Sequence, residues 1–176
     1  MRDAMVAALS FNIFHKYTER LKMANIAQIA NVLQSMVLTR GDQMVLTPTY
    51  HVFRMYNVHQ DATYLPLTCD SKSFTDGNGR ECPIVDATAS RDAEGKVHVT
   101  ITNTDLAEGA EVTVDLGKDV EGNICAEVLT SINIQDHNDF GNGSLVAPVQ
   151  FTDYKVKSGR LVVNMPAKSI VSLTIL

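Results

Sequence analysis

Short runs that alternate apolar and polar residues fill the second half of the chain, and they constrain its fold more than any other feature. The clearest runs cover residues 96–102, 111–116, 160–163 and 169–175, and two further strands are expected at 85–90 and 124–129. A period of two is that of a strand with one buried face, and turn signals such as Asp92-Ala93-Glu94-Gly95 and Lys157-Ser158-Gly159 separate the runs. Several short strands at this spacing favour an antiparallel sandwich or barrel. Residues 61–176 are therefore predicted to form a C-terminal β-sandwich domain.

The first sixty residues follow a different pattern. Residues 3–21 carry apolar side chains around most of a helix, and the short apolar run 23–29 fits a strand buried on both faces. A hairpin is expected from residue 35 to residue 46. Thr47 then suits a helix N-cap and Pro48 the first helical position, so a second helix is predicted at 48–57. Helix, strand and helix form only one β/α unit, and one unit makes no sheet. Residues 1–60 are thus expected to be an incomplete segment of a larger fold.

Composition excludes several classes of function. The chain of 176 residues has 45% hydrophobic and 20% charged residues, as in ordinary globular proteins, and a formal net charge of −5 with no Lys/Arg run. Nucleic-acid and membrane partners are not expected, because both need clustered positive charge or long apolar segments. No export signal is visible, and a cytoplasmic and an exported parent both remain compatible with the sequence. Three cysteines without a C-x-x-C pair predict free thiols, with Cys69 and Cys82 the pair whose spacing would close a loop.

No catalytic constellation is found. Glycoside hydrolysis needs two carboxyl groups that flank the scissile bond, yet Asp3, Glu19, Asp42 and Asp61 fall in helix ends and turns rather than after a strand. The histidines show no metal-ligand spacing, and the cluster from Asp136 to Asp139 is expected to satisfy its own loop backbone. No catalytic residue, metal ligand or cofactor site is predicted.

Three blocks of sequence nevertheless resemble one enzyme family. These are DAMVAALSFNIFHKYTERLKMANIAQIANVLQS at residues 3–35, MVLTPTYHVFRMYNVHQDATYLP at 44–66 and VNMPAKSIVSLTIL at the end. They resemble the C-terminal part of family 51 α-L-arabinofuranosidases, closely in the first 65 residues and loosely in the sandwich. The resemblance implies a (β/α)8 barrel followed by a jelly-roll-like sandwich, and retaining removal of terminal α-L-arabinofuranosyl groups from arabinan and arabinoxylan in L-arabinose metabolism. Residues 1–60 would then be a helix-strand-helix remnant of that barrel.

The resemblance also implies what this chain can and cannot do. Both catalytic glutamates of the family lie on earlier barrel strands, so this chain alone is expected to be inactive. Gln28 matches a glutamine that binds the sugar to be cleaved, although a purely structural role of Gln28 in the following loop is the alternative; Asn31 is a weaker candidate. The family's sandwich borrows strands from the start of the full chain, which leaves an edge that a second copy would cover in a homo-oligomer. A second interpretation is a stand-alone carbohydrate-binding or accessory sandwich, which the lack of Trp disfavours.

Overall fold

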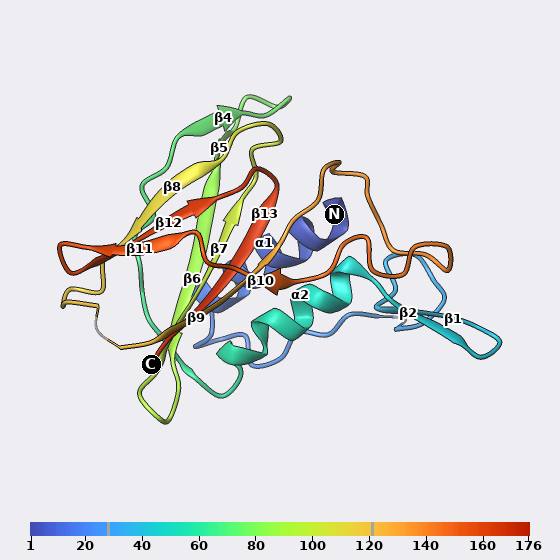
Figure 1. Cartoon of the computed structure of the whole chain (residues 1–176), viewed down its shortest axis with the longest axis horizontal. Coiled ribbons are helices and arrows are strands. Elements are labelled where there is room, and N and C mark those ends of the chain that lie inside the picture. Colours follow the sequence, from blue (N-terminus) through green and yellow to red (C-terminus); the bar gives the residue numbers. More distant parts are fainter. Residues whose placement is uncertain (28, 121) are drawn as a thin grey trace.

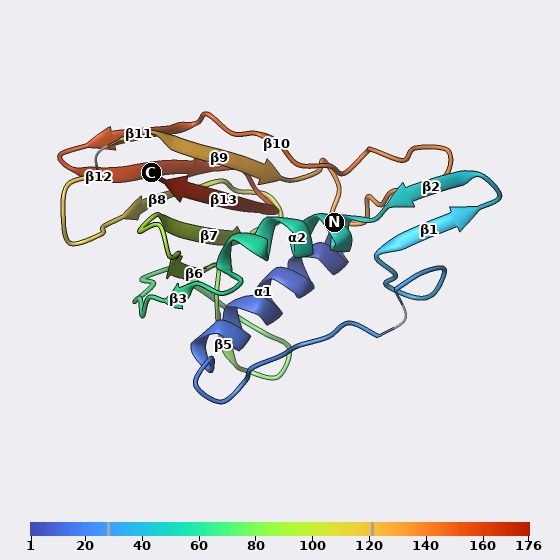
Figure 2. The ribbon, with the colours of Figure 1, turned by 90° about the horizontal axis from the view of Figure 1, so that it is seen from below.

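The chain is mainly β, with every named strand pairing antiparallel, in a computed structural model that describes residues 1–27, 29–120 and 122–176. Two packed sheets form a sandwich, and two helices lie along the outer face of the larger sheet (Figure 1). The same arrangement is clear from below, where the helices sit under the sheet and a hairpin extends beyond their N-terminal ends (Figure 2). The prediction of a mainly β chain with a C-terminal sandwich is confirmed.

The six strands predicted for the sandwich all form, with small shifts at their ends. The larger sheet has the order β10-β9-β13-β7-β6-β3 and consists of β3 (Thr63–Tyr64), β6 (Val85–Arg91), β7 (Val97–Asn103), β9 (Ile124–Leu129), β10 (Val149–Gln150) and β13 (Ser169–Ile175). The smaller sheet has the order β11-β12-β8 and consists of β8 (Ala110–Val114), β11 (Tyr154–Lys157) and β12 (Arg160–Met165). Two separate hairpins are β1 (Val37–Arg40) with β2 (Gln43–Leu46), and β4 (Ser73–Thr75) with β5 (Glu81–Pro83).

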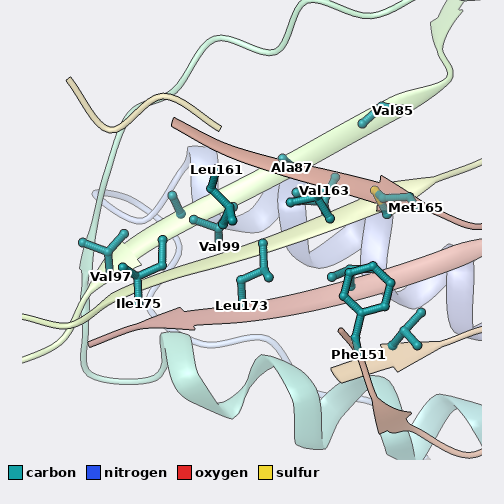
Figure 3. Close-up of a cluster of buried hydrophobic side chains, with 14 of the residues drawn as sticks. Val85, Ala87, Val97, Val99, Phe151, Leu161, Val163, Met165, Leu173 and Ile175 are labelled. Carbon is teal, nitrogen blue, oxygen red and sulfur yellow. The ribbon is translucent and has the colours of Figure 1, made fainter. Parts of the chain in front are cut away.

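One apolar core lies between the two sheets. Alternate residues of the larger sheet, such as Val99 and Leu173, face Leu161 and Val163 of β12 (Figure 3). Leu161, Val163 and Leu173 are fully buried. Burial of one such side chain stabilises a fold by about 1.5–3 kcal/mol. The runs of alternating apolar and polar residues predicted such a core between two sheets.

Two helices carry the first part of the chain onto the sandwich. They are α1 (Arg2–Lys16) and α2 (Pro48–Tyr56), and a 3-10 turn η1 (Asn57–His59) follows α2. The predicted N-cap is confirmed, because the Tyr50 backbone N–H donates to Thr47 Oγ1 over 3.4 Å. Helix α1 ends earlier than predicted, since the Tyr17 and Thr18 backbone N–H groups bond three residues back instead of four.

The predicted strand at residues 23–29 is not observed. Residues 21–27 and 29 form no strand, and Met23 and Ile29 are 73% and 60% exposed. Ala30 makes only an isolated parallel bridge to Val37. An apolar run becomes a buried parallel strand only where other strands hydrogen-bond to both of its edges. The described part of the chain supplies no such pair of neighbouring strands at residues 21–27 and 29, so these residues form no strand and most of them are exposed.

Candidate functional site

The interface between the helices and the larger sheet is polar and buried at the same time. Strands β6 and β7 turn their apolar residues into the sandwich core and their polar residues toward α1 and the 3-10 turn η1. The polar residues on this face are Asp86, Thr88, Ser90, His98, Thr100 and Thr102, and all of them are buried. Buried polar groups need hydrogen-bond partners, so the helices must supply matching groups.

A carboxylate on β6 lies at the centre of one set of contacts. Asp86 accepts hydrogen bonds from Asn12 Nδ2 and Lys16 Nζ, each at 3.1 Å. The oxygen of the Asn12 amide lies 2.7 Å from the hydroxyl of Tyr56, which reaches across from α2. Burial raises the pKa of Tyr56 above its ordinary value, so this hydroxyl keeps its proton and donates. These four side chains fix both helices to one strand.

Three histidines form a column beside this network. The rings of His15 and His59 have centroids 5.0 Å apart, and those of His59 and His98 lie 6.3 Å apart. Both ring nitrogens of His59 are engaged, by Ser90 Oγ at 2.7 Å and Thr100 Oγ1 at 2.9 Å. Burial, followed by the charges that His15 and His98 would carry, lowers the pKa of His59 to about 3. The His59 ring is neutral, buried and bonded at both nitrogens, so it has no free group for a substrate and instead joins η1 to β6 and β7.

The acids considered for catalysis lie at the surface. Asp3 pairs with the neighbouring Arg2 at 3.0 Å, and Glu19, Asp42 and Asp61 are exposed. None of the four follows a strand in the way that barrel enzymes place their catalytic carboxylates.

The loop that contains Asp136 to Asp139 satisfies its own backbone, as predicted. Asp136 accepts from the Asn133 backbone N–H at 3.0 Å and from Ser131. Asn138 is buried and bonds the carbonyl oxygens of Leu46 and Val146 at 2.9 and 2.8 Å. Among the described residues no cluster of three or more His, Cys, Asp or Glu is arranged to hold a metal ion.

The predicted sugar-binding residue Gln28 lies outside the described residues. Asn31, the weaker candidate, is bound to the start of the hairpin. Its amide group donates to Thr39 Oγ1 at 2.8 Å and accepts from the Thr39 backbone N–H at 2.7 Å. The side chain of Asn31 therefore stabilises the loop that follows Gln28. The three cysteines, including Cys69 and Cys82, are free thiols. Within the part of the chain that the structure describes, no helix is long and apolar enough to cross a membrane.

A cavity of about 650 Å³ opens along the edge of the smaller sheet. It lies between edge strand β8, the inner face of β6 and β7, and the segment 67–72. Its floor is apolar, with Ala87, Val99 and Ile101, whereas its rim carries charged groups such as Asp70 and Glu111. The pairing found for β8 is with β12, on the other side. Strand β8 is therefore an edge strand of the described smaller sheet, and the cavity lies beside it.

The buried polar face was not identified from sequence. Asp86, Thr88 and Ser90 alternate with valine and alanine, so they indicate a solvent-facing side of the strand. The one available signal was the scarcity of charged residues: a solvent-facing side usually carries several Lys or Glu, and this side of β6 and β7 carries hydroxyls, histidine and a single aspartate.

Residues 1–169 match the family described as the alpha-L-arabinofuranosidase C-terminal domain. An intracellular exo-alpha-L-arabinofuranosidase from Bacteroides ovatus is 51% identical over 175 residues, which cover 98% of this chain and 34% of that protein. The GH51 arabinofuranosidase structure from Xanthomonas axonopodis pv. citri is 41% identical with a TM-score of 0.91, over 98% of this chain and 35% of that one. A Thermotoga maritima α-L-arabinofuranosidase in complex with arabinose shares the fold, with a TM-score of 0.84 and 19% identity, over 98% of this chain and 37% of that one. The chain thus spans about a third of the length of these relatives.

Proposed function

The chain belongs to the α-L-arabinofuranosidase C-terminal domain family, and from this premise we propose that it is part of an enzyme that hydrolyses terminal α-L-arabinofuranosyl groups of arabinan or arabinoxylan with retention. The observation that carries the proposal is the match over residues 1–169, joined to a relative of 51% identity that covers nearly the whole chain. The reaction and its substrates belong to the parent enzyme, of which this chain corresponds to the C-terminal third.

We propose that residues 1–60 are the terminal segment of the catalytic barrel and that residues 61–176 are the sandwich domain. Helices α1 and α2 are in contact and run in the same direction, as successive helices of a β/α barrel do (Figure 2). The side of α1 that faces away from the sheet is apolar, with Val6 55% and Ile13 52% exposed. The remaining barrel would cover this side, and its strands would be the neighbours that residues 23–29 need.

We propose that this chain by itself is inactive. In the retaining mechanism one carboxyl group donates a proton to the leaving group and a second attacks the anomeric carbon. The acids of residues 1–60 are solvated or paired with Arg2, and the family resemblance places both catalytic glutamates upstream. Gln28 is proposed to contact the arabinofuranosyl group, because an amide both donates to and accepts from sugar hydroxyls. The strands that complete the sandwich would fill the cavity along β8.

A chimera tests these proposals. This chain would replace the corresponding C-terminal part of the Bacteroides ovatus relative, and hydrolysis of an aryl α-L-arabinofuranoside would be measured. We expect turnover by the chimera and none by the isolated chain. Turnover by the isolated chain would contradict its proposed inactivity, and a folded but inactive chimera would contradict the proposed parent enzyme.

A binding module is the less favoured function. Sugar-binding sandwiches present exposed aromatic rings, because sugar faces stack on them. The β half of this chain has no Trp, and the hydroxyl of Tyr154 is held by the carbonyl oxygen of Ile124 at 2.9 Å.

A further inference from the structure

The loop of residues 131–146 and the hairpin β1-β2 form one connected unit, here named the rim unit. The amide group of Asn138 joins them, because its Nδ2 donates to the carbonyl oxygens of both Leu46 and Val146. The Val146 backbone N–H returns a bond to Asn138 Oδ1 at 2.8 Å. Near the hairpin turn, the guanidinium carbon of Arg40 lies 4.1 Å from the centre of the Phe140 ring. A loop of the sandwich is therefore fixed to the segment that precedes α2.

The rim unit lies at the N-terminal ends of both helices. The Arg2 backbone N–H donates to the Ile134 carbonyl oxygen at 2.8 Å, and the amino group of Met1 contacts the Asp136 carbonyl. The hairpin leads directly into Thr47, the N-cap of α2. Both views show the hairpin and the orange loop together at this end (Figures 1 and 2). In a β/α barrel the helices run back against the strands, so their N-terminal ends mark the face where the strands end and the chemistry occurs.

A concavity with the right chemistry for a sugar lies on this unit. Its volume is about 680 Å³, and its lining includes the polar side chains of Asn133, Gln135, His137 and Asn142 beside Ile134 and Leu145. The carboxylates of the same loop are occupied, since Asp139 Oδ1 accepts the backbone N–H groups of Gly141 and Asn142. Amide and imidazole groups with an apolar floor suit an uncharged, hydroxyl-rich ligand.

We propose that this concavity is a subsite for the polysaccharide chain on the leaving-group side of the bond that is cleaved. The assignment rests on the proposed function, because the barrel face that the rim unit borders is catalytic only in such an enzyme. The subsite takes pentose units of the polymer, and the sandwich domain thereby contributes to the choice of substrate. The Nδ1 atom of His137 already contacts the Gln135 carbonyl oxygen at 3.1 Å, so His137 through Nε2 and Asn142 through its amide group hold these units by hydrogen bonds to hydroxyl groups.

Titration of the 176-residue chain with α-1,5-linked arabinotriose, followed by amide NMR shifts, tests the subsite without catalysis. We expect shifts of the loop amides at millimolar sugar. In the double variant His137→Ala/Asn142→Ala the shifts should disappear, while the variant Asn78→Ala, on the distant β4-β5 hairpin, should keep them. The backbone bonds of Asn142 to Asp139 do not depend on either side chain, so the loop keeps its form. Unshifted loop amides, or equal shifts in the double variant, would overturn the proposal.

The chimeric enzyme provides the second measurement. The ratio of kcat/KM on arabinotriose to kcat/KM on an aryl arabinofuranoside should fall about tenfold in the double variant, the equivalent of one or two lost hydrogen bonds. Lys155→Ala, on β11 of the smaller sheet, serves as the matched control and should leave the ratio unchanged. An unchanged ratio in the double variant also overturns the subsite. An unmodified chimera that folds without turnover refutes the proposed function itself, and with it the assignment of the concavity to the leaving-group side.

Discussion

At the scale of single residues, the helices are held to the sandwich by polar groups rather than by apolar contact alone. Asp86 is 9% exposed and binds one neutral and one charged donor, Asn12 and Lys16. Burial of a carboxylate costs free energy, and here a hydrogen bond to each of its two oxygens offsets that cost. These two contacts fix the position of α1 on β6. Asp86 therefore helps to determine how the helices pack on the sandwich.

Replacement of this carboxylate should lower stability markedly. We expect Asp86→Ala to reduce the free energy of unfolding by about 2–3 kcal/mol, because the buried amide of Asn12 loses its acceptor. Urea unfolding followed by circular dichroism measures the change. The matched variant Asp42→Ala removes an exposed turn carboxylate and should cost less than about 0.5 kcal/mol. Equal effects of the two substitutions would show that the contacts of Asp86 contribute little.

The histidine column makes stability depend on pH. The pKa of His59 is about 3 in the folded chain and 6.5 in a model peptide, so the unfolded chain binds a proton that the folded chain excludes. His59 makes its full contribution to the free energy of unfolding above about pH 6.5. This contribution is lost progressively as the pH falls toward 3, by at most about 1.4 kcal/mol per pH unit. Burial lowers the pKa of His15 in the same direction.

The variant His59→Gln tests this dependence. Its free energy of unfolding should change less than that of the wild type between about pH 7 and pH 5, because one of the groups that bind protons only on unfolding is gone. The exposed neighbour Gln60→Ala removes no titratable group, so it is the control and should keep the wild-type slope. A His59→Gln slope identical to that of the wild type would contradict the role assigned to His59.

At the scale of elements, the sequence predicts those whose partners lie within the described chain. The turn at Ser158-Gly159 is one example: both residues have positive φ, 52° and 74°, as a two-residue hairpin requires, and the pattern of β12 follows directly. Residues 23–29 are the opposite case, because an apolar run indicates burial without saying what covers it. The site shows a second division, between residues with local partners and residues with partners far away in the sequence. Local turn chemistry predicted the loop at Asp136, whereas the polar face of β6 depends on helices that lie far away in the sequence.

The start of α2 is an element whose stability depends on one side chain. Thr47 Oγ1 accepts the Tyr50 backbone N–H, and its hydroxyl donates to the Ser35 carbonyl oxygen at 2.7 Å. We expect Thr47→Ala to lower the free energy of unfolding by about 1–2 kcal/mol, and Thr47→Ser to retain most of it. Thermal unfolding of the two variants gives the comparison. The prediction fails if alanine and serine are equivalent at this position.

At the scale of the whole molecule, the two sides of the helix layer are unlike each other. One side meets the sheet through Ala4, Ala8 and Asn12, all of which are fully buried. The other side exposes large apolar residues over α1 and the segment after it, namely Val6, Ile13, Phe14, Tyr17, Leu21, Met23 and Ile29. Soluble monomers rarely expose so many large apolar residues on two adjoining segments, which marks this side as a contact surface. The proposed barrel would cover it in the parent enzyme.

Without that barrel, the same surface should make the isolated chain self-associate. We expect its average mass in sedimentation equilibrium to rise with concentration, and the double variant Val6→Glu/Ile13→Glu to remain a monomer, because charges on the surface oppose its burial. Both side chains are more than half exposed, so the fold should survive the change, which circular dichroism verifies. The matched control Val156→Glu places a charge at a 49% exposed position of β11 and should associate like the wild type. Association that persists in the Val6/Ile13 variant and disappears in Val156→Glu would instead locate the contact at β11, the edge strand of the smaller sheet opposite β8.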